Sequence, residues 1–169
     1  MYISGKRDET IGLNGSFEII DSGYPVNWKF HGPPIKKGDA KVLLDTRIVK
    51  DGKHSLKIVA HHVRTTDRIW KRPGFKTTIP VESGKKYRLS FFLRNNGCKF
   101  YVGWICGIGW KKETRSKYVV RSKESFDEWR FFQDTLTISE LEDRINLNFV
   151  ITEPGTLWVD DVRVEEVHR

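Results

Sequence analysis

The feature of this sequence that most limits its fold is a regular succession of short alternating segments separated by turn residues. Side chains at successive strand positions point to opposite faces of a sheet, so alternation of apolar and polar residues predicts a strand with one buried face. About ten such segments follow one another at roughly ten-residue spacing, with Gly, Asn, Asp or Pro between them. One short helical turn is expected, at Ser139 to Asp143. The pattern predicts an antiparallel all-β sandwich or barrel.

The expected strands cover 17–20, 42–49, 55–62, 74–80, 86–94, 99–110, 117–121, 129–138, 144–152 and 156–166. The length of 169 residues corresponds to about one domain. We therefore expect residues 1–12 to form an N-terminal extension and residues 13–169 to form a single domain.

Two segments, 86–94 and 144–152, show the alternation most clearly. Their apolar face consists of Tyr87, Leu89, Phe91, Leu93, Ile145, Leu147, Phe149 and Ile151. Their opposite face carries Arg88, Phe92, Arg94, Arg144, Asn146 and Asn148, and Tyr101 joins it if the segment 99–110 alternates in the same way. Planar amide and guanidinium groups hydrogen-bond hydroxyls, and rings stack on the C–H faces of sugars. These residues predict a carbohydrate-binding face, and a solvated outer face is the alternative.

Tryptophans in two loops are further candidates for a binding site. Trp70 and Trp110 stand beside Arg and Lys residues, so the indole rings can stack on a sugar while the basic neighbours neutralise an acidic group. The alternative is that both tryptophans pack at the rim of a sandwich. The chain has 30 Lys and Arg against 22 Asp and Glu, a formal net charge of +8. An acidic polysaccharide is therefore included among the expected ligands.

The order of several segments resembles the xylan- and glucan-binding type of carbohydrate-binding module, which has a galactose-binding-like jelly-roll fold. The segments are 13–18 (LNGSFE), 23–25 with Trp28, 51–58 (DGKHSLKI), 84–94 (GKKYRLSFFLR), Trp129 and 155–162 (GTLWVDDV). The resemblance implies a non-catalytic module that holds a polysaccharide or oligosaccharide on the outer face of the concave sheet or at rim loops. It also implies attachment to a glycan-degrading enzyme or surface protein, outside the cell or in the periplasm.

A structural calcium ion is the second implication of the resemblance. The ligands would be the carboxylates of Glu18 and Asp160, with backbone oxygens near Ser16 and Lys53. Unbroken alternation in the last strand places Asp160 among apolar residues, and a buried carboxylate needs a partner or a metal ion. A β-bulge would exchange Asp160 with Asp161. Backbone amides bonded to Asp160 are the alternative to calcium.

Other features exclude some classes of protein and leave others open. Cys98 and Cys106 lie in one expected strand, roughly 26 Å apart if it is straight, so we expect free, buried thiols. No apolar run reaches about 18 residues, so no membrane span is expected. The first ten residues are too polar for a signal peptide, so we expect either a cytosolic protein or the removal of a targeting segment, and the resemblance favours the second. A protein-interaction module, a small jelly-roll polysaccharide-degrading enzyme and a nucleic-acid binder remain alternatives, although the scattered basic residues disfavour nucleic acid.

Overall fold

The computed structural model describes residues 2–3, 13–31, 39–63, 72–109 and 112–168, and the description below concerns these ranges. Every regular element within them is a β-strand. The short strands are β1 (Tyr2–Ile3), β2 (Ile20–Asp21), β3 (Tyr24–Pro25) and β4 (Lys29–His31). The longer strands are β5 (Ala40–Asp45), β6 (Ser55–Ala60), β7 (Gly74–Pro80), β8 (Lys86–Asn96), β9 (Lys99–Ile108), β10 (Lys112–Ser122), β11 (Phe126–Thr137), β12 (Arg144–Glu153) and β13 (Gly155–Glu166).

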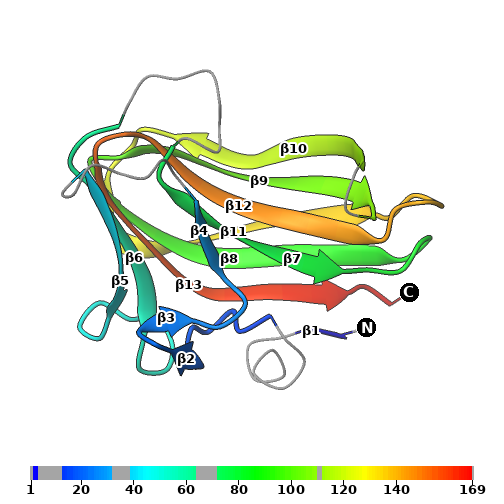
Figure 1. Ribbon diagram of the computed structural model, residues 1–169, viewed down its shortest axis with the longest axis horizontal. Coiled ribbons are helices and arrows are strands. Elements are labelled where there is room, and N and C mark those ends of the chain that lie inside the picture. Colours follow the sequence, from blue (N-terminus) through cyan, green and yellow to red (C-terminus); the bar gives the residue numbers. More distant parts are fainter. Residues whose placement is uncertain (1, 4–12, 32–38, 64–71, 110–111, 169) are drawn as a thin grey trace.

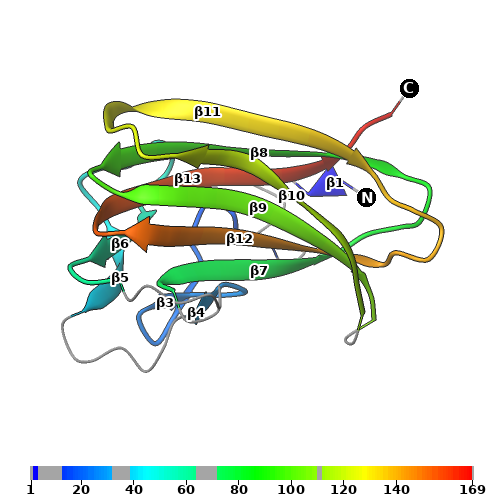
Figure 2. The ribbon, with the colours of Figure 1, turned by 90° about the horizontal axis from the view of Figure 1, so that it is seen from above.

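The strands form two antiparallel sheets that pack face to face. Sheet A has the order β11-β8-β13-β6-β5, with β1 paired to β13, and sheet B has the order β10-β9-β12-β7-β4. In Figure 2, β11, β8 and β13 of sheet A lie above β9, β12 and β7 of sheet B. The hairpin of β2 and β3 lies beside β5 and β6 at one end of the molecule (Figure 1). The predicted β-sandwich is confirmed.

The predicted strands from residue 42 onward are all present, with ends that differ by a few residues. The region from 17 to 20 was predicted as a strand, but only Ile20 is in one. Phe17 instead adopts a φ of 59°. The Asn14 side chain causes this local fold, because it bonds the backbone N–H and C=O of Ile19 and the C=O of Val26 at 2.8–3.1 Å. The predicted helical turn is a hydrogen-bonded turn that forms no helix.

The core confirms the alternation predicted for 86–94 and 144–152. All eight residues predicted to face inward are completely buried. They pack with an aromatic cluster in which Phe75 stacks on Phe149 with ring centroids 4.8 Å apart. The Phe17 ring closes this cluster against Trp28, at a centroid distance of 5.1 Å. The turn that replaces the first predicted strand therefore contributes a core residue to the interior.

A β-bulge interrupts the last strand and overturns the alternation expected there. Asp161 has a φ of 48°, and the register of β13 against β8 shifts between Asp160 and Arg163. Trp158 and Asp160 therefore face outward from sheet A, whereas Val162 lies in the core. The expectation that Asp160 shares a face with Val162 and Val164 is wrong, because one extra residue reverses the side-chain parity.

Strand β10 forms one edge of sheet B, and its first seven residues are all exposed. An ion pair of 3.0 Å joins Lys117 on this strand to Asp134 on β11, the edge strand of sheet A. The indole of Trp104 donates a hydrogen bond of 2.9 Å to the same carboxylate. These contacts join the two sheets at their β10 and β11 edges.

A buried carboxylate holds the turn between β11 and β12. The side chain of Glu142 is 2% exposed and accepts hydrogen bonds from the Thr114 hydroxyl, the Arg115 guanidinium and the Ser139 N–H. The Arg115 guanidinium lowers the pKa of Glu142 from 4.5 to about 2. The ionised carboxylate is therefore part of the folded structure at neutral pH.

Replacing Glu142 with Gln should lower the free energy of unfolding at neutral pH by about 2 kcal/mol, less than for a fully buried pair because Arg115 is partly exposed. The pKa of Glu142 is lower in the folded chain, so its stabilisation is complete above about pH 4.5 and is lost as the pH falls toward 2. Urea unfolding should thus show a gap between wild type and E142Q that narrows in acid. Glu124→Gln, in the exposed pair with Arg130, is the control and should leave stability unchanged. A gap that is independent of pH would contradict the assignment.

Candidate functional site

The structure divides the residues predicted to bind carbohydrate between two opposite surfaces. Tyr101, Arg144, Asn146 and Asn148 lie on β9 and β12 and face outward from sheet B. Arg88, Phe92 and Arg94 lie on β8 and face outward from sheet A. The two groups cannot contact the same stretch of ligand, because the packed core separates them. Trp70 and Trp110 lie outside the described residues.

The outer face of sheet B is an ordered array of side chains, because residues paired in antiparallel register point to the same side. Four rows cross the sheet from β4 to β10, and β4 does not reach the last two. The first row is His31, Gly74, Val150, Tyr101 and Arg121, and the second is Lys29, Lys76, Asn148, Gly103 and Tyr118. The third row is Thr78, Asn146, Ile105 and Ser116, and the fourth is Pro80, Arg144, Gly107 and Glu113.

A groove of about 170 Å³ lies over the first three rows on this face. Its lining residues are Tyr101, Gly103, Trp104, Ile105, Ser116, Lys117, Tyr118 and Asn148. Gly103 removes a side chain from the middle of the groove, and the Tyr118 ring lies beside it. The groove thus has an open floor and an aromatic wall, as expected for stacking of a flat ligand.

Tyr101 provides an unsatisfied polar atom in this groove. The residue is 6% exposed, and its ring meets that of Tyr118 edge-on with centroids 5.0 Å apart. Its hydroxyl is buried and has no hydrogen-bond partner among the described residues. Burial raises the pKa of Tyr101 to about 12, so the hydroxyl keeps its proton at neutral pH. Because buried polar groups are nearly always hydrogen-bonded, this hydroxyl is suited to bind a group that enters the groove.

The predicted polar residues of β12 differ in what they can offer a ligand. Asn146 is already bonded to the Thr78 hydroxyl at 2.6 Å, whereas Asn148 lines the groove directly. Arg144 lies over Gly107, where a Cβ atom would be 2.6 Å from the guanidinium. Gly107 thus makes room for Arg144, whereas Gly103 opens the floor of the groove.

The face of sheet B is predominantly basic. Lys29, Lys76, Arg121 and Arg144 lie in its rows, and Glu113 at one end is the sole carboxylate among the described residues of these rows. Burial, with a smaller effect from Lys76, lowers the pKa of His31 to about 4, so this imidazole is neutral. The face therefore attracts anionic groups.

Three site residues escaped the sequence-based prediction. Tyr118 lies on an edge strand whose first half has no buried face, so alternation could not assign its direction. Lys29 lies on a three-residue strand, too short for periodicity to show. Lys76 lies in a predicted strand, and the alternation of β7, with buried Phe75 and Thr77, was the available signal.

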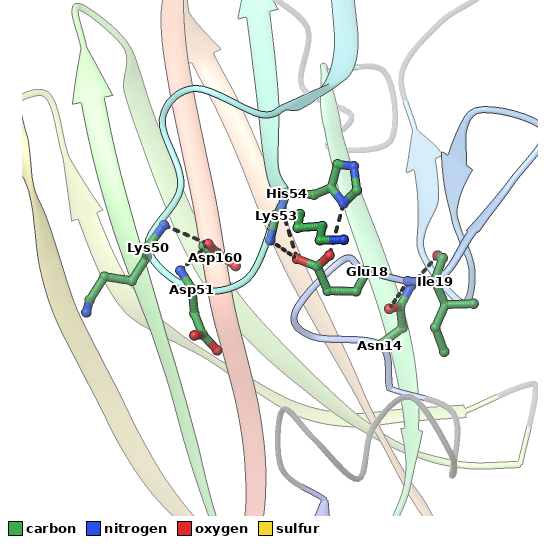
Figure 3. Close-up of polar contacts among 8 residues, drawn as sticks. All are labelled: Asn14, Glu18, Ile19, Lys50, Asp51, Lys53, His54 and Asp160. Atoms are coloured by element: carbon green, nitrogen blue, oxygen red, sulfur yellow. Dashed lines mark hydrogen bonds and ion pairs between the residues drawn. The ribbon is translucent and has the colours of Figure 1, made fainter.

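The carboxylates proposed to bind calcium lie on either side of the turn between β5 and β6 (Figure 3). One oxygen of Asp160 accepts hydrogen bonds from the backbone N–H groups of Lys50 and Asp51, at 2.9 and 3.0 Å, and the other accepts from its neighbour Asp161. One oxygen of Glu18 accepts from the N–H groups of Lys53 and His54, at 2.7 and 2.9 Å. This turn therefore presents N–H donors to both carboxylates.

This set of donors does not fit a calcium ion, which requires six to eight oxygen ligands. The second oxygen of Glu18 lies 3.0 Å from the His54 imidazole. No group of three or more His, Cys, Asp or Glu able to hold a metal occurs in the described part of the chain. Burial raises the pKa of Asp160 to about 7, although its three hydrogen bonds favour the ionised form. The contacts match the alternative in which backbone amides satisfy Asp160, and they disfavour the calcium ion that the resemblance implies.

The two cysteines are free and buried, as predicted. Burial raises the pKa of Cys98 to about 12 and that of Cys106 to about 11, so neither is a reactive thiolate at neutral pH. Within the ranges described, no helix is long and apolar enough to cross a membrane.

Comparison with solved structures places this sandwich among the jelly rolls of carbohydrate-binding modules. The C-terminal family 22 carbohydrate-binding module of Clostridium thermocellum xylanase 10B superposes with a TM-score of 0.61 at 15% identity, covering 92% of this chain and 98% of that one. The N-terminal CBM22-1 and GH10 modules of the same enzyme, complexed with xylohexaose, match with a TM-score of 0.62 at 14% identity, covering 83% of this chain.

A second kind of neighbour is the enzymatically active domain of tailspike protein 4 from bacteriophage CBA120, with a TM-score of 0.68 and 16% identity over 90% of this chain. The chain spans only 20% of that tailspike structure and 26% of the two-module xylanase structure. No protein-family model matches the sequence, and a search of curated proteins finds no match. The comparisons therefore show the jelly-roll fold that the sequence predicted.

The contacts around Glu18 and Asp160 predict that calcium does not stabilise this domain. After treatment with a chelator, the protein should melt at the same temperature with and without added calcium in scanning calorimetry. Glu18→Gln should lower that temperature equally in both conditions, because it weakens the bonds to Lys53 and His54. A rise of several degrees on adding calcium to the wild type, absent in E18Q, would contradict this and support the calcium prediction.

Proposed function

We propose that this chain is a non-catalytic carbohydrate-binding module that holds a polysaccharide across the outer face of sheet B. The observation that carries the proposal is the buried Tyr101 hydroxyl, which lacks a partner in the part of the chain that the structure describes and lies in a groove walled by the Tyr118 ring. A sugar fits this groove, because its hydroxyls can hydrogen-bond the Tyr101 hydroxyl and its C–H face can stack on the Tyr118 ring. The amide of Asn148 adds a planar polar group to the same groove.

The structural neighbours support this proposal. The matched family 22 module is a carbohydrate-binding module studied for ligand binding in its cleft, and the matched xylanase structure contains xylohexaose. By analogy we infer that the chain acts as a module of a glycan-degrading or glycan-binding protein outside the cell. The tailspike neighbour keeps a small jelly-roll enzyme as the second candidate, for which release of reducing sugar from the bound polysaccharide is the test.

The basic character of the face supports an acidic polysaccharide, such as one that contains uronic acids, as a preferred ligand. Lys29 and Lys76 extend the row of Tyr118, and Arg121 lies over the Tyr118 ring at 5.0 Å. A carboxylate on a sugar bound at Tyr118 would therefore lie near cationic side chains. Binding of a neutral chain uses the same aromatic and amide groups without this electrostatic contribution.

Tyr101→Phe tests the proposed site most directly. Removing a hydroxyl that has no partner within the described ranges should leave the free energy of unfolding unchanged or slightly higher. The same change should weaken oligosaccharide binding by about tenfold, because the hydrogen bond to the ligand is lost. Calorimetric titration with xylohexaose and with oligogalacturonate measures this effect. Tyr24→Phe, exposed on β3, is the matched control and should bind as the wild type does. If Y101F retains full affinity for every glycan that the wild type binds, the site is not in this groove.

Charge on the face should be visible in the salt dependence of binding. Raising the salt from about 0.05 M to about 0.5 M should weaken binding of polygalacturonate and leave xylohexaose binding unchanged, because exposed charges are screened. Lys76→Ala should reduce the affinity for polygalacturonate alone. Lys41 is exposed on β5 of sheet A, away from this face, so Lys41→Ala serves as the control and should keep the affinity for polygalacturonate. Equal salt dependence for both glycans would exclude a preference for acidic chains.

A further inference from the structure

The outer face of sheet A carries a second groove that the proposed function does not use. It has a volume of about 300 Å³ and is lined by Arg88, Ser90, Phe92, Phe131, Gln133, Asp161, Arg163 and Glu165. These residues belong to β11, β8 and β13, which lie in the layer opposite β9 and β12 (Figure 2). The volume is within the range of small-molecule sites, roughly 300 to 1,000 Å³.

An aromatic pair forms the apolar part of this second groove. Phe131 on β11 is 51% exposed, and its ring lies 5.2 Å from that of Phe92, its partner across the strands. The Lys50 ammonium lies 4.7 Å from the centre of the Phe92 ring. Lys50 is held there by the turn whose N–H groups bind Asp160. Because about half of Phe131 is exposed beside Phe92, part of its ring is available for a ligand to stack on.

The polar groups of the second groove are ready to hydrogen-bond a ligand. Arg88, Gln133 and Glu165 form no side-chain hydrogen bond or ion pair within the described part of the chain. Arg88 and Glu165 are register partners, and Gln133 lies one row away, on the row of Ser90. An amide, a guanidinium and a carboxylate thus line the groove on one side of the exposed ring, in the two rows that follow that of Phe131 and Phe92, and together they offer both donors and acceptors to sugar hydroxyls.

The charges of the two faces differ. The second groove combines Arg88 and Arg163 with Asp161 and Glu165, and Arg163 is bonded to Asp161 at 2.8 Å. Mixed charges repel a polyanion in part and bind neutral hydroxyl groups well. A protein partner is disfavoured, because Phe131 and the distant Leu43 are the strongly exposed large apolar residues of this sheet face among those described. A protein interface requires a larger apolar centre.

We propose that the groove at Phe131 is a second glycan-binding site that takes a neutral polysaccharide segment, so that one module binds two chains on opposite sides. The inference rests on the proposed function, because it assumes that the chain binds glycans. With sheet B holding one chain and sheet A another, the domain would cross-link polysaccharide strands.

The test is calorimetric titration of the intact chain with three neutral probes, xylohexaose, cellohexaose and mannohexaose. The wild type should bind at least one of them at two sites per molecule. Phe131→Ala should retain the sheet B site and weaken the second site by about tenfold or more. Arg88→Ala should weaken the same site while leaving the aromatic pair in place. Leu43→Ala, which removes an exposed apolar side chain from the same sheet, is the matched control and should keep both sites.

The outcomes separate this inference from the proposed function. One outcome of the titration is a stoichiometry of one oligosaccharide per molecule, with binding lost in Tyr118→Ala and unchanged in Phe131→Ala. This result would overturn the second site and leave the proposed function standing. A wild type that binds neither these probes nor polygalacturonate would overturn both. Dimerisation of the free chain in analytical ultracentrifugation that disappears in Phe131→Ala would also overturn the second site, because a second copy of the chain would then cover this groove.

Discussion

The burial of one alternating face of each sheet is the constraint on which the rest of this structure depends. Phe75, Phe91 and Phe149 come from both sheets and meet in the middle, and strands such as β8 and β12 give every second side chain to the core. Recognition is left to the outward-facing half. Those residues fall on two surfaces that face away from each other, and residues close in sequence, such as Arg94 and Tyr101, lie on opposite sides of the domain.

The strands and their buried faces could be predicted from the sequence, whereas the composition of the binding face could not. Alternation states which side chains of a strand are buried, but it does not state which sheet the strand joins. For this reason Arg88 and Asn148 were expected on one face and are found on two. Tyr118 was missed because the first half of β10 has no buried side. Phe131 was missed because it is adjacent to Phe132, and alternation does not state which of two neighbouring phenylalanines faces outward.

The bulge at Asp161 shows how a single residue changes the chemistry of a surface. Regular alternation beyond Asp160 would have turned Val162 and Val164 outward with it. The bulge returns these valines to the core, while Asp160 faces outward and the turn that follows β5 covers it with N–H groups. The same turn bonds Glu18, so it connects the N-terminal segment to the last strand by hydrogen bonds. Sequence motifs identify these acids, but the choice between a metal ion and amide donors depends on backbone positions.

The charged edge strand β10 has a consequence for how such domains behave when crowded together. An uncovered strand edge offers unpaired N–H and C=O groups to any other edge, which is a route to intermolecular sheets. Here that edge carries Lys112, Glu113 and Arg115, and Lys117 is held inward toward Asp134. Two copies that approach by this edge meet repulsion between lysines and arginines before their backbones can pair. Such an edge disfavours pairing between copies of the domain when they are concentrated.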